Sequence, residues 1–172
     1  MWRRGPRCGE RNSLRSKLPA WLPVFGLAAL TVAVDQITKF VVRAYIPLGD
    51  SLPAHGFVRL THTTNTGGVF GLFANQGFLL TVVVILLVAV LLLYLRYSPL
   101  RHRLLKVGLG LELGGAVGNL IDRLSLGKVT DFIDVGAWPV FNLADSAITV
   151  GAVVLAAYLV LAARSRAPSE EK

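Results

Sequence analysis

The stretch FLLTVVVILLVAVLLLYL, from Phe78 to Leu95, decides the class of fold. None of its 18 residues is charged, and its length approaches the ~20 residues that a helix needs to cross the hydrocarbon core of a bilayer. A helix on the outside of a soluble bundle needs a polar face towards water, and this stretch has none. The sequence therefore predicts a membrane-spanning helix here.

Three more apolar segments lie on either side of this stretch, at about residues 21–42, 104–121 and 140–163. Of the 172 residues, 53% are hydrophobic and only 16% are charged, whereas soluble domains carry roughly 25% charged residues. We therefore expect a mainly α-helical membrane protein, in which residues 1–172 form a single domain with four transmembrane helices. Residues 1–20 are expected to form a basic extension that precedes them.

The positions of the basic residues predict how the helices are oriented. The net charge of +8 comes in short clusters between apolar segments, which indicates membrane topology and argues against a nucleic-acid partner. Thirteen Lys and Arg residues belong to the two terminal segments and the connection between the second and third helices, and at most five belong to the other side. The positive-inside rule then places both termini in the cytoplasm and the loops at about residues 43–77 and 122–139 outside it.

The first of these outer loops carries a pattern typical of β-strands. In FVRLTHTTNTGGVFGLF, residues 57–73, β-branched and aromatic residues alternate with others, and glycines mark a turn. We expect short strands here that lie on the outer membrane surface.

Ionisable residues within a membrane span are costly and by default indicate function. Asp145 shares one helical face with Asn142, three residues before it, and Thr149, four residues after it. Such a polar face must point towards protein or water, so it is either a hydrogen-bonded seam between helices or a functional site. We favour the site, because a carboxylate is a costly way to build a seam.

The third apolar segment combines small and polar residues. Gly110, Gly114 and Gly118 are spaced by four, which predicts close packing against a neighbouring helix. Three polar residues follow at the outer membrane surface and form either a helix-end ion pair with polar caps or part of a site: Asn119, Asp122 and Arg123.

Three ionisable groups in the first and third segments have less obvious roles. Asp35 and Lys39 are spaced i, i+4 on the first helix, and we favour a structural ion pair over a catalytic role for them. Glu112 has Lys39 and Lys106 as candidate partners, or is neutral, and its sequence context indicates no role.

The remaining pattern favours acid chemistry. The three histidines lack the spacing of zinc ligands, so no metal site is predicted, and no serine or cysteine nucleophile motif is present. Asp131 and Asp145 are separated by 13 residues that include GAWP, enough for the chain to turn back. Both carboxyl groups can then lie at one membrane depth, share a proton and activate a water, as in aspartic proteases.

Five blocks in this order resemble those of prolipoprotein signal peptidase, also called signal peptidase II. They are DQITK (35–39), NTGGVFG (65–71), GGAVGNLIDR (114–123), VTDFIDV (129–135) and FNLADSAITVG (141–151). They spread over roughly two thirds of the chain, and the last three together are highly specific. One departure is Gly68 and Val69, where the family usually has alanines; it concerns packing and not the acids.

The resemblance implies a four-helix membrane aspartic endopeptidase with a small β-rich platform on the extracytoplasmic face. Such an enzyme lies in the bacterial plasma membrane and cuts prolipoproteins just before a cysteine that carries a diacylglyceryl group. It needs no cofactor, contacts membrane lipid, and is expected to be a monomer. Asp131 and Asp145 match the catalytic positions, and the matches to other site positions and to the first motif are Asn65, Asn119, Asp122, Arg123, Asn142 and Asp35.

Two other hypotheses concern the same residues. A small transporter would use Asp35, Glu112 and Asp145 as a proton relay, and a non-catalytic scaffold would tolerate Asp→Asn changes at Asp131 and Asp145. A hypothesis within the peptidase interpretation is that Gly114 and Gly118 leave room for the substrate helix or its acyl chains.

Overall fold

The computed structural model describes residues 19–66 and 77–165. Its elements follow the order α1 (Leu22–Tyr45), β1 (Ser51–Leu52), β2 (Arg59–Asn65), α2 (Gly77–Tyr97), α3 (Arg103–Leu126), β3 (Val129–Asp134) and α4 (Leu143–Arg164). Most of the expected basic extension, and the glycine turn with Gly68 and Val69, lie outside the described residues.

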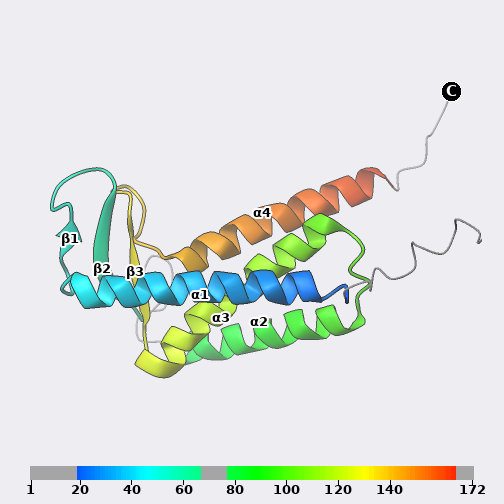
Figure 1. Ribbon diagram of the computed structural model, residues 1–172, viewed down its shortest axis with the longest axis horizontal. Coiled ribbons are helices and arrows are strands. Elements are labelled where there is room, and N and C mark those ends of the chain that lie inside the picture. The colour runs from blue at the N-terminus through cyan, green and yellow to red at the C-terminus, as the bar shows by residue number, and fades with distance from the viewer. Residues whose placement is uncertain (1–18, 67–76, 166–172) are drawn as a thin grey trace, which may run out of the picture.

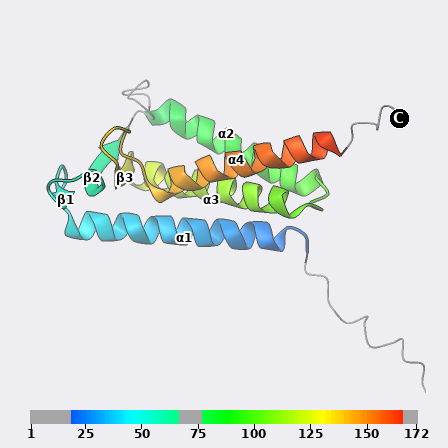
Figure 2. The same ribbon diagram turned by 90° about the horizontal axis from the view of Figure 1, so that it is seen from above.

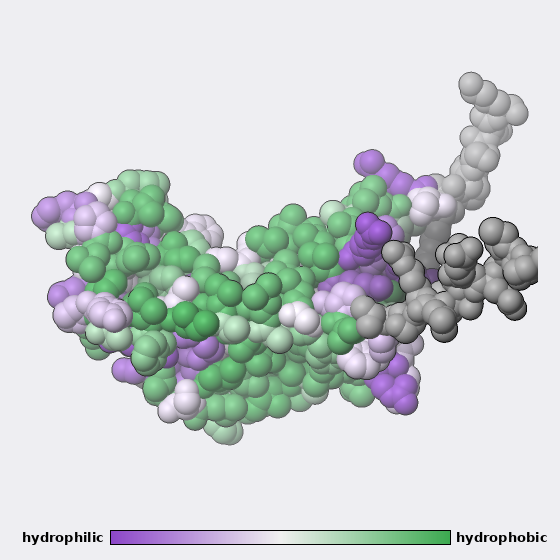
Figure 3. Space-filling view, viewed as in Figure 1, coloured by the Kyte–Doolittle hydropathy of each residue, from purple (hydrophilic) through white to green (hydrophobic). Residues whose placement is uncertain are grey.

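The helices form an elongated bundle with the three strands at one end, and α1 begins and α4 ends at the other (Figures 1 and 2). All four helices are long and apolar enough to cross a membrane. Figure 3 shows an apolar band over them, with polar residues gathered towards both ends. The prediction of four spanning helices and a small sheet is therefore confirmed.

Helix α3 is the central element of the bundle. It packs against α1, α2 and α4, and 56% of its most apolar window is buried, against 22% or less for the other helices. Helix α2 carries almost no buried side chain, as expected of a helix that faces lipid on most sides. The polar residues of the third segment consequently lie where several elements meet.

The glycines of α3 explain its close packing against α1. A Cβ added at Gly114 would lie 2.6 Å from Thr31 Cβ and 2.8 Å from the carbonyl oxygen of Ala28, and one added at Gly118 would lie 2.7 Å from the Asp35 carboxylate. The predicted packing role is confirmed. The hypothesis that Gly114 and Gly118 leave room for a substrate is wrong, because α1 already occupies that space.

Local chemistry sets the helix ends. Helix α1 stops at Tyr45 because Ile46 precedes a proline and is extended. Helix α3 continues past the expected residue 121 to Leu126, where Gly127 adopts a left-handed φ of 71°. Helix α4 begins at Leu143, later than the expected residue 140, because Asn142 is its N-cap.

The strands form an antiparallel sheet in the order β1-β2-β3. The register shifts between Leu60 and Thr63 on β2, so that Leu60 is opposite Ile133 but Thr63 is opposite Asp131. An additional residue on one strand is a β-bulge, which bends the strand and re-aims side chains next to it. The sheet thus carries Asp131 to the end of the bundle where α4 starts.

Candidate active site

Asn142 joins the two candidate catalytic aspartates. It is fully buried, and its side-chain Nδ2 donates a hydrogen bond to Asp131 Oδ1 at 2.7 Å. Its backbone N–H donates to Asp145 Oδ2 at 3.2 Å, and its Oδ1 accepts from the backbone N–H of Asp145 at 3.0 Å. Asn142 and Asp145 therefore form a reciprocal capping box, and the same cap holds the carboxyl group of Asp131 beside that of Asp145.

Asn119 of α3 completes this arrangement. Its Nδ2 donates to Asp145 Oδ1 at 2.8 Å, and its Oδ1 accepts from Asn142 Nδ2 at 3.2 Å. Each carboxylate oxygen of Asp145 thus accepts one N–H donor. The two asparagines fix the carboxyl groups from both sides.

Asp131 lies in an environment that favours its protonated form. Its exposed fraction is 3%. This burial, followed by the negative charge of Asp145, raises the pKa of Asp131 to about 7, and hydrogen bonds from Asn142 and Asn65 oppose the rise. Two acids that face each other share a proton most easily when one of them has such a pKa.

Two further buried acids hold the residues that precede the catalytic candidates. Asp35 Oδ1 accepts the backbone N–H of Ala144 at 2.9 Å, directly before Asp145. Asp122 Oδ2 accepts the backbone N–H of Thr130 at 2.9 Å, directly before Asp131. Each catalytic candidate is therefore tied to the bundle through its neighbour in the chain.

Lys39 connects these two acids and Asn119. Its ammonium nitrogen lies 2.9 Å from Asp35 Oδ2, 3.3 Å from Asp122 Oδ2 and 2.9 Å from Asn119 Oδ1. Asp122 also lies 3.8 Å from Arg43 Nη1. The sequence also allowed a helix-end ion pair between Asp122 and its neighbour Arg123. In the structure Asp122 pairs with Lys39 and Arg43 instead. The Asp35–Lys39 pair expected from the sequence is present.

Arg123 lies at the edge of the site. Its Nη1 donates to the carbonyl oxygen of Asn119 at 3.4 Å, and its charge interacts with Asp145, Asp131 and Asp122. Its side chain is half-buried. Arg123 thus places a positive charge near both catalytic candidates, and part of its side chain is accessible to solvent.

Two residues singled out in the spans lie apart from the aspartates. The hydroxyl of Thr149 donates to the carbonyl oxygen of Asp145 on its own helix, and Thr149 is exposed, so the polar face stops at Asp145. Glu112 packs against Gly151 of α4 and forms no ion pair with the described residues. Lys39, one of its two candidate partners, is instead bound by Asp35 and Asp122.

Asp134, the third aspartate of this region, stabilises the sheet. It accepts from Arg59 Nη2 at 2.6 Å, from Thr61 Oγ1 at 2.9 Å and from the backbone N–H of Gly136 at 2.9 Å. The Gly136 N–H, followed by Thr61, lowers the pKa of Asp134. Asp134 therefore stays ionised as a structural anchor.

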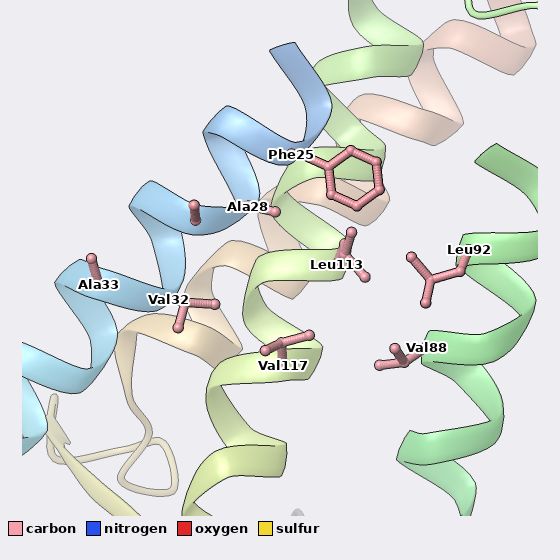
Figure 4. Close-up of a pocket in the computed structure, with 9 residues that line it drawn as sticks. Phe25, Ala28, Val32, Ala33, Val88, Leu92, Leu113 and Val117 are labelled. Carbon is pink, nitrogen blue, oxygen red and sulfur yellow. The ribbon is translucent and has the colours of Figure 1, made fainter. Parts of the chain in front are cut away.

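An apolar groove of about 430 Å³ lies between α1, α2 and α3, away from these residues. Figure 4 shows Phe25, Leu92 and Leu113 around it. All of its lining side chains are apolar, so it offers no group for hydrolysis. The polar cluster at the end of the bundle that carries the sheet is the better candidate for the active site.

Sequence reasoning identified most of this cluster but missed three contributors. The structure brings together both catalytic candidates and all six other residues expected at the site. The sequence did not indicate that Lys39 contacts Asn119, that Gln36 donates to Asp35 and Asp122, or that Thr130 is an anchor. For the contacts of Gln36, the available signal was its position beside Asp35 on an apolar helix.

Comparisons with known proteins agree on one family. The sequence model of the signal peptidase (SPase) II family matches residues 27–161. A lipoprotein signal peptidase of Moorella thermoacetica is 45% identical over 143 residues, which cover 83% of this chain and 95% of that protein. One from Desulforapulum autotrophicum is 44% identical over 145 residues, covering 78% of this chain and 89% of the relative.

Solved structures show the same fold. A bacterial membrane enzyme determined by the in meso method at 2.3 Å resolution superposes with a TM-score of 0.78 and is 27% identical, covering 87% of this chain and 94% of that one. A second, determined at 1.9 Å resolution, gives a TM-score of 0.71 at 28% identity and covers 79% and 91% of the two chains. The likeness therefore extends over most of the length of each chain.

Proposed function

The chain belongs to the signal peptidase II family of membrane aspartic peptidases, and from this premise we propose that Asp131 and Asp145 are the carboxyl groups with which it removes signal peptides from prolipoproteins. The observation that carries the proposal is Asn142, whose side chain and backbone N–H bind both carboxyl groups. A bridge of this kind holds the two carboxyl groups in fixed positions relative to each other, as catalysis by a pair of groups requires.

The chemistry requires one proton shared between the two acids. Below pH ~7 Asp131 holds it, because its pKa is about 7, and Asp145 is the base. Asp145 takes a proton from a water molecule, whose oxygen attacks the carbonyl carbon of the scissile bond, while Asp131 donates its proton to the carbonyl oxygen. When the tetrahedral intermediate collapses, Asp131 takes a proton from one of its hydroxyl groups, the C–N bond breaks and the leaving amine takes the proton held by Asp145, which restores both acids.

Asn119 and Asn142 keep their N–H groups on the carboxyl groups through these steps, and Asn65 does the same for Asp131. Arg123 places a positive charge beside both acids, where it stabilises negative charge that develops on the substrate. These residues prepare the site before the substrate arrives, so little reorganisation is needed during the reaction.

The placement of the site suits a substrate that spans the membrane. Asp145 lies in the first turn of α4 and Asp131 in the sheet at the end of the bundle. Thirteen of the 18 Lys and Arg residues belong to the two terminal segments and the connection between α2 and α3, so the positive-inside rule predicts that the aspartates lie at the extracytoplasmic face. The substrate is then a diacylglyceryl-modified prolipoprotein, cut just before its modified cysteine, by a monomeric enzyme in contact with membrane lipid.

The test uses purified protein in detergent with a diacylglyceryl-modified prolipoprotein and compares wild type with Asp131→Asn and Asp145→Asn. We expect each variant to lose activity by a factor of about 10²–10⁴, the usual cost of losing an acid–base group. Cleavage is followed by gel shift, and the melting temperature of each variant reports its folding.

Asp134→Asn is the matched control, because it removes an acid of the same strand that anchors the sheet and does not bind the other two. It should retain cleavage when folded. Wild-type cleavage rates in either Asp131→Asn or Asp145→Asn would remove that residue from the catalytic pair.

A further inference from the structure

We propose that Lys39 is a positioning residue of the active site, whose buried ammonium group sets the places of both catalytic aspartates. The proposal rests on the function proposed above for Asp131 and Asp145. It goes beyond the structural pair with Asp35 that the i, i+4 spacing indicates, because the contacts of Lys39 reach α3 and, through it, both β3 and α4.

The contacts of Lys39 lead to both aspartates by separate routes. Lys39 pairs with Asp35, and the carboxylate of Asp35 accepts the backbone N–H of Ala144, the residue directly before Asp145. Lys39 also pairs with Asp122, whose carboxylate accepts the backbone N–H of Thr130, the residue directly before Asp131. A displacement of the ammonium would therefore move both carboxyl groups relative to each other.

A third route runs through Asn119. An asparagine amide can be turned so that its oxygen and nitrogen exchange places, and only its partners decide between the two orientations. Lys39 has donors only, so its contact at 2.9 Å must be to the amide oxygen. The Nδ2 group of Asn119 is consequently directed at Asp145 Oδ1, 2.8 Å away. Lys39 therefore acts together with Asn142, whose Nδ2 donates to the same oxygen at 3.2 Å, to direct the nitrogen of Asn119 towards the catalytic pair.

The burial of Lys39 separates this role from substrate binding. Its exposed fraction is 0%, so it cannot touch a substrate. An ammonium group has three N–H donors, and Asp35, Asp122 and Asn119 supply three acceptors. Its positive charge also lowers the pKa of Asp131. A positioning role therefore predicts a change in turnover and in pH profile, without a change in affinity.

The charged groups that face Asp131 come from three helices. They are Lys39 on α1, Arg123 on α3 and Asp145 on α4. Asp35 is not among the groups that shift the pKa of Asp131. Asp35→Asn is therefore the reference for the double variant, because the two proteins differ only at Lys39.

The experiment compares four proteins in the detergent assay: wild type, Lys39→Met, Asp35→Asn and the double variant Asp35→Asn/Lys39→Met. The double variant removes one charge of each sign, so it leaves no unpaired charge where Lys39 and Asp35 were. Relative to Asp35→Asn, it should show a kcat about 10- to 100-fold lower, with KM changed by less than about twofold. The alkaline limb of its pH profile should lie at higher pH, because the charge that lowers the pKa of Asp131 is gone.

Each other outcome decides against the proposal. An unchanged kcat and pH profile in the folded double variant would make Lys39 a bystander, and a loss of folding in the double variant, with Asp35→Asn folded, would make it a structural residue only. Lys39→Met, when folded, must repeat the shift to higher pH. Asp131→Asn and Asp145→Asn are assayed beside these variants, so that a failure of the proposed catalytic pair is recognised separately from a failure of the role of Lys39.

Discussion

At the scale of single residues, the charge of Asp131 has a consequence that can be measured as a pH dependence. Burial and the facing Asp145 raise its pKa to about 7. The protonated form is the one that donates to the substrate, so activity is retained below this pKa and is lost as pH rises through it. We expect kcat/KM to fall about tenfold per pH unit above pH ~7.5.

This pH dependence is checked by steady-state kinetics from pH ~5 to pH ~9, with melting temperatures at both ends to exclude unfolding. A plateau that continues to pH ~9 would mean that Asp131 does not carry the required proton.

Asn142 combines two tasks in one side chain, capping α4 and binding Asp131. Asn142→Ala should lower the free energy of unfolding by ~1 kcal/mol for the lost cap, and should lower kcat by ~10²-fold because the aspartates lose their common partner. Thermal melts and kinetics measure the two effects separately.

Thr149→Ala is the comparison for this variant, since it removes a hydroxyl from the same helix that bonds only to the backbone and is exposed. It should change the free energy of unfolding by less than ~0.5 kcal/mol. An Asn142→Ala protein with wild-type kcat would show that Asn142 only caps the helix.

At the scale of elements, the contact between α1 and α3 depends on glycine. Gly114→Ala would place a methyl group against Thr31 and the backbone of Ala28, and backbone cannot move aside as a side chain can. We expect a loss of ~1–3 kcal/mol from overpacking. Gly26→Ala is the control on α1, because among the described residues nothing beyond the adjacent backbone of its own helix lies within 4 Å of its added Cβ, and it should be neutral or slightly stabilising. Equal melting temperatures for the two variants would contradict the packing at Gly114.

The elements themselves could largely be predicted from the sequence. The apolar segments predicted the helices, because a long uncharged stretch such as 78–95 is rarely anything other than a membrane-spanning helix. The strand that carries Asp131 was not predicted, because a six-residue strand with two aspartates has no strong period and is defined by its partner β2. The start of α4 was misplaced because Asn142 was interpreted as part of the helix, whereas Asn is a strong N-cap.

At the scale of the whole molecule, the orientation in the membrane is open to a direct test. Cys8 is the single cysteine, so a Cys8→Ser background permits single-cysteine labelling. We expect Ala137→Cys, exposed in the connection from β3 to α4, to react with an impermeant maleimide added to intact cells. Arg101→Cys, exposed between α2 and α3, should react only after the membrane is permeabilised. The reverse pattern would invert the proposed topology.

The residues of the site could be predicted more readily than the contacts between them. Asn119, Asp122 and Asn142 were expected at the site through a family resemblance. Their links through Lys39 join residues about 80 positions apart in the chain, and no local spacing encodes such a contact. A buried network of this kind becomes visible only when the bundle is assembled.

The ion pair between Asp35 and Lys39 also bears on how the chain is made. The two partners lie one turn apart on α1, so this helix, which is synthesised before α2, α3 and α4, carries its own counter-charge and enters the bilayer with no net charge from this pair. Asp122 differs, because its cationic partners Lys39 and Arg43 belong to α1 and not to its own helix. Insertion of α1 therefore does not depend on α3, whereas Asp122 of α3 gains its ion pairs with Lys39 and Arg43 only when α3 docks against a helix synthesised earlier.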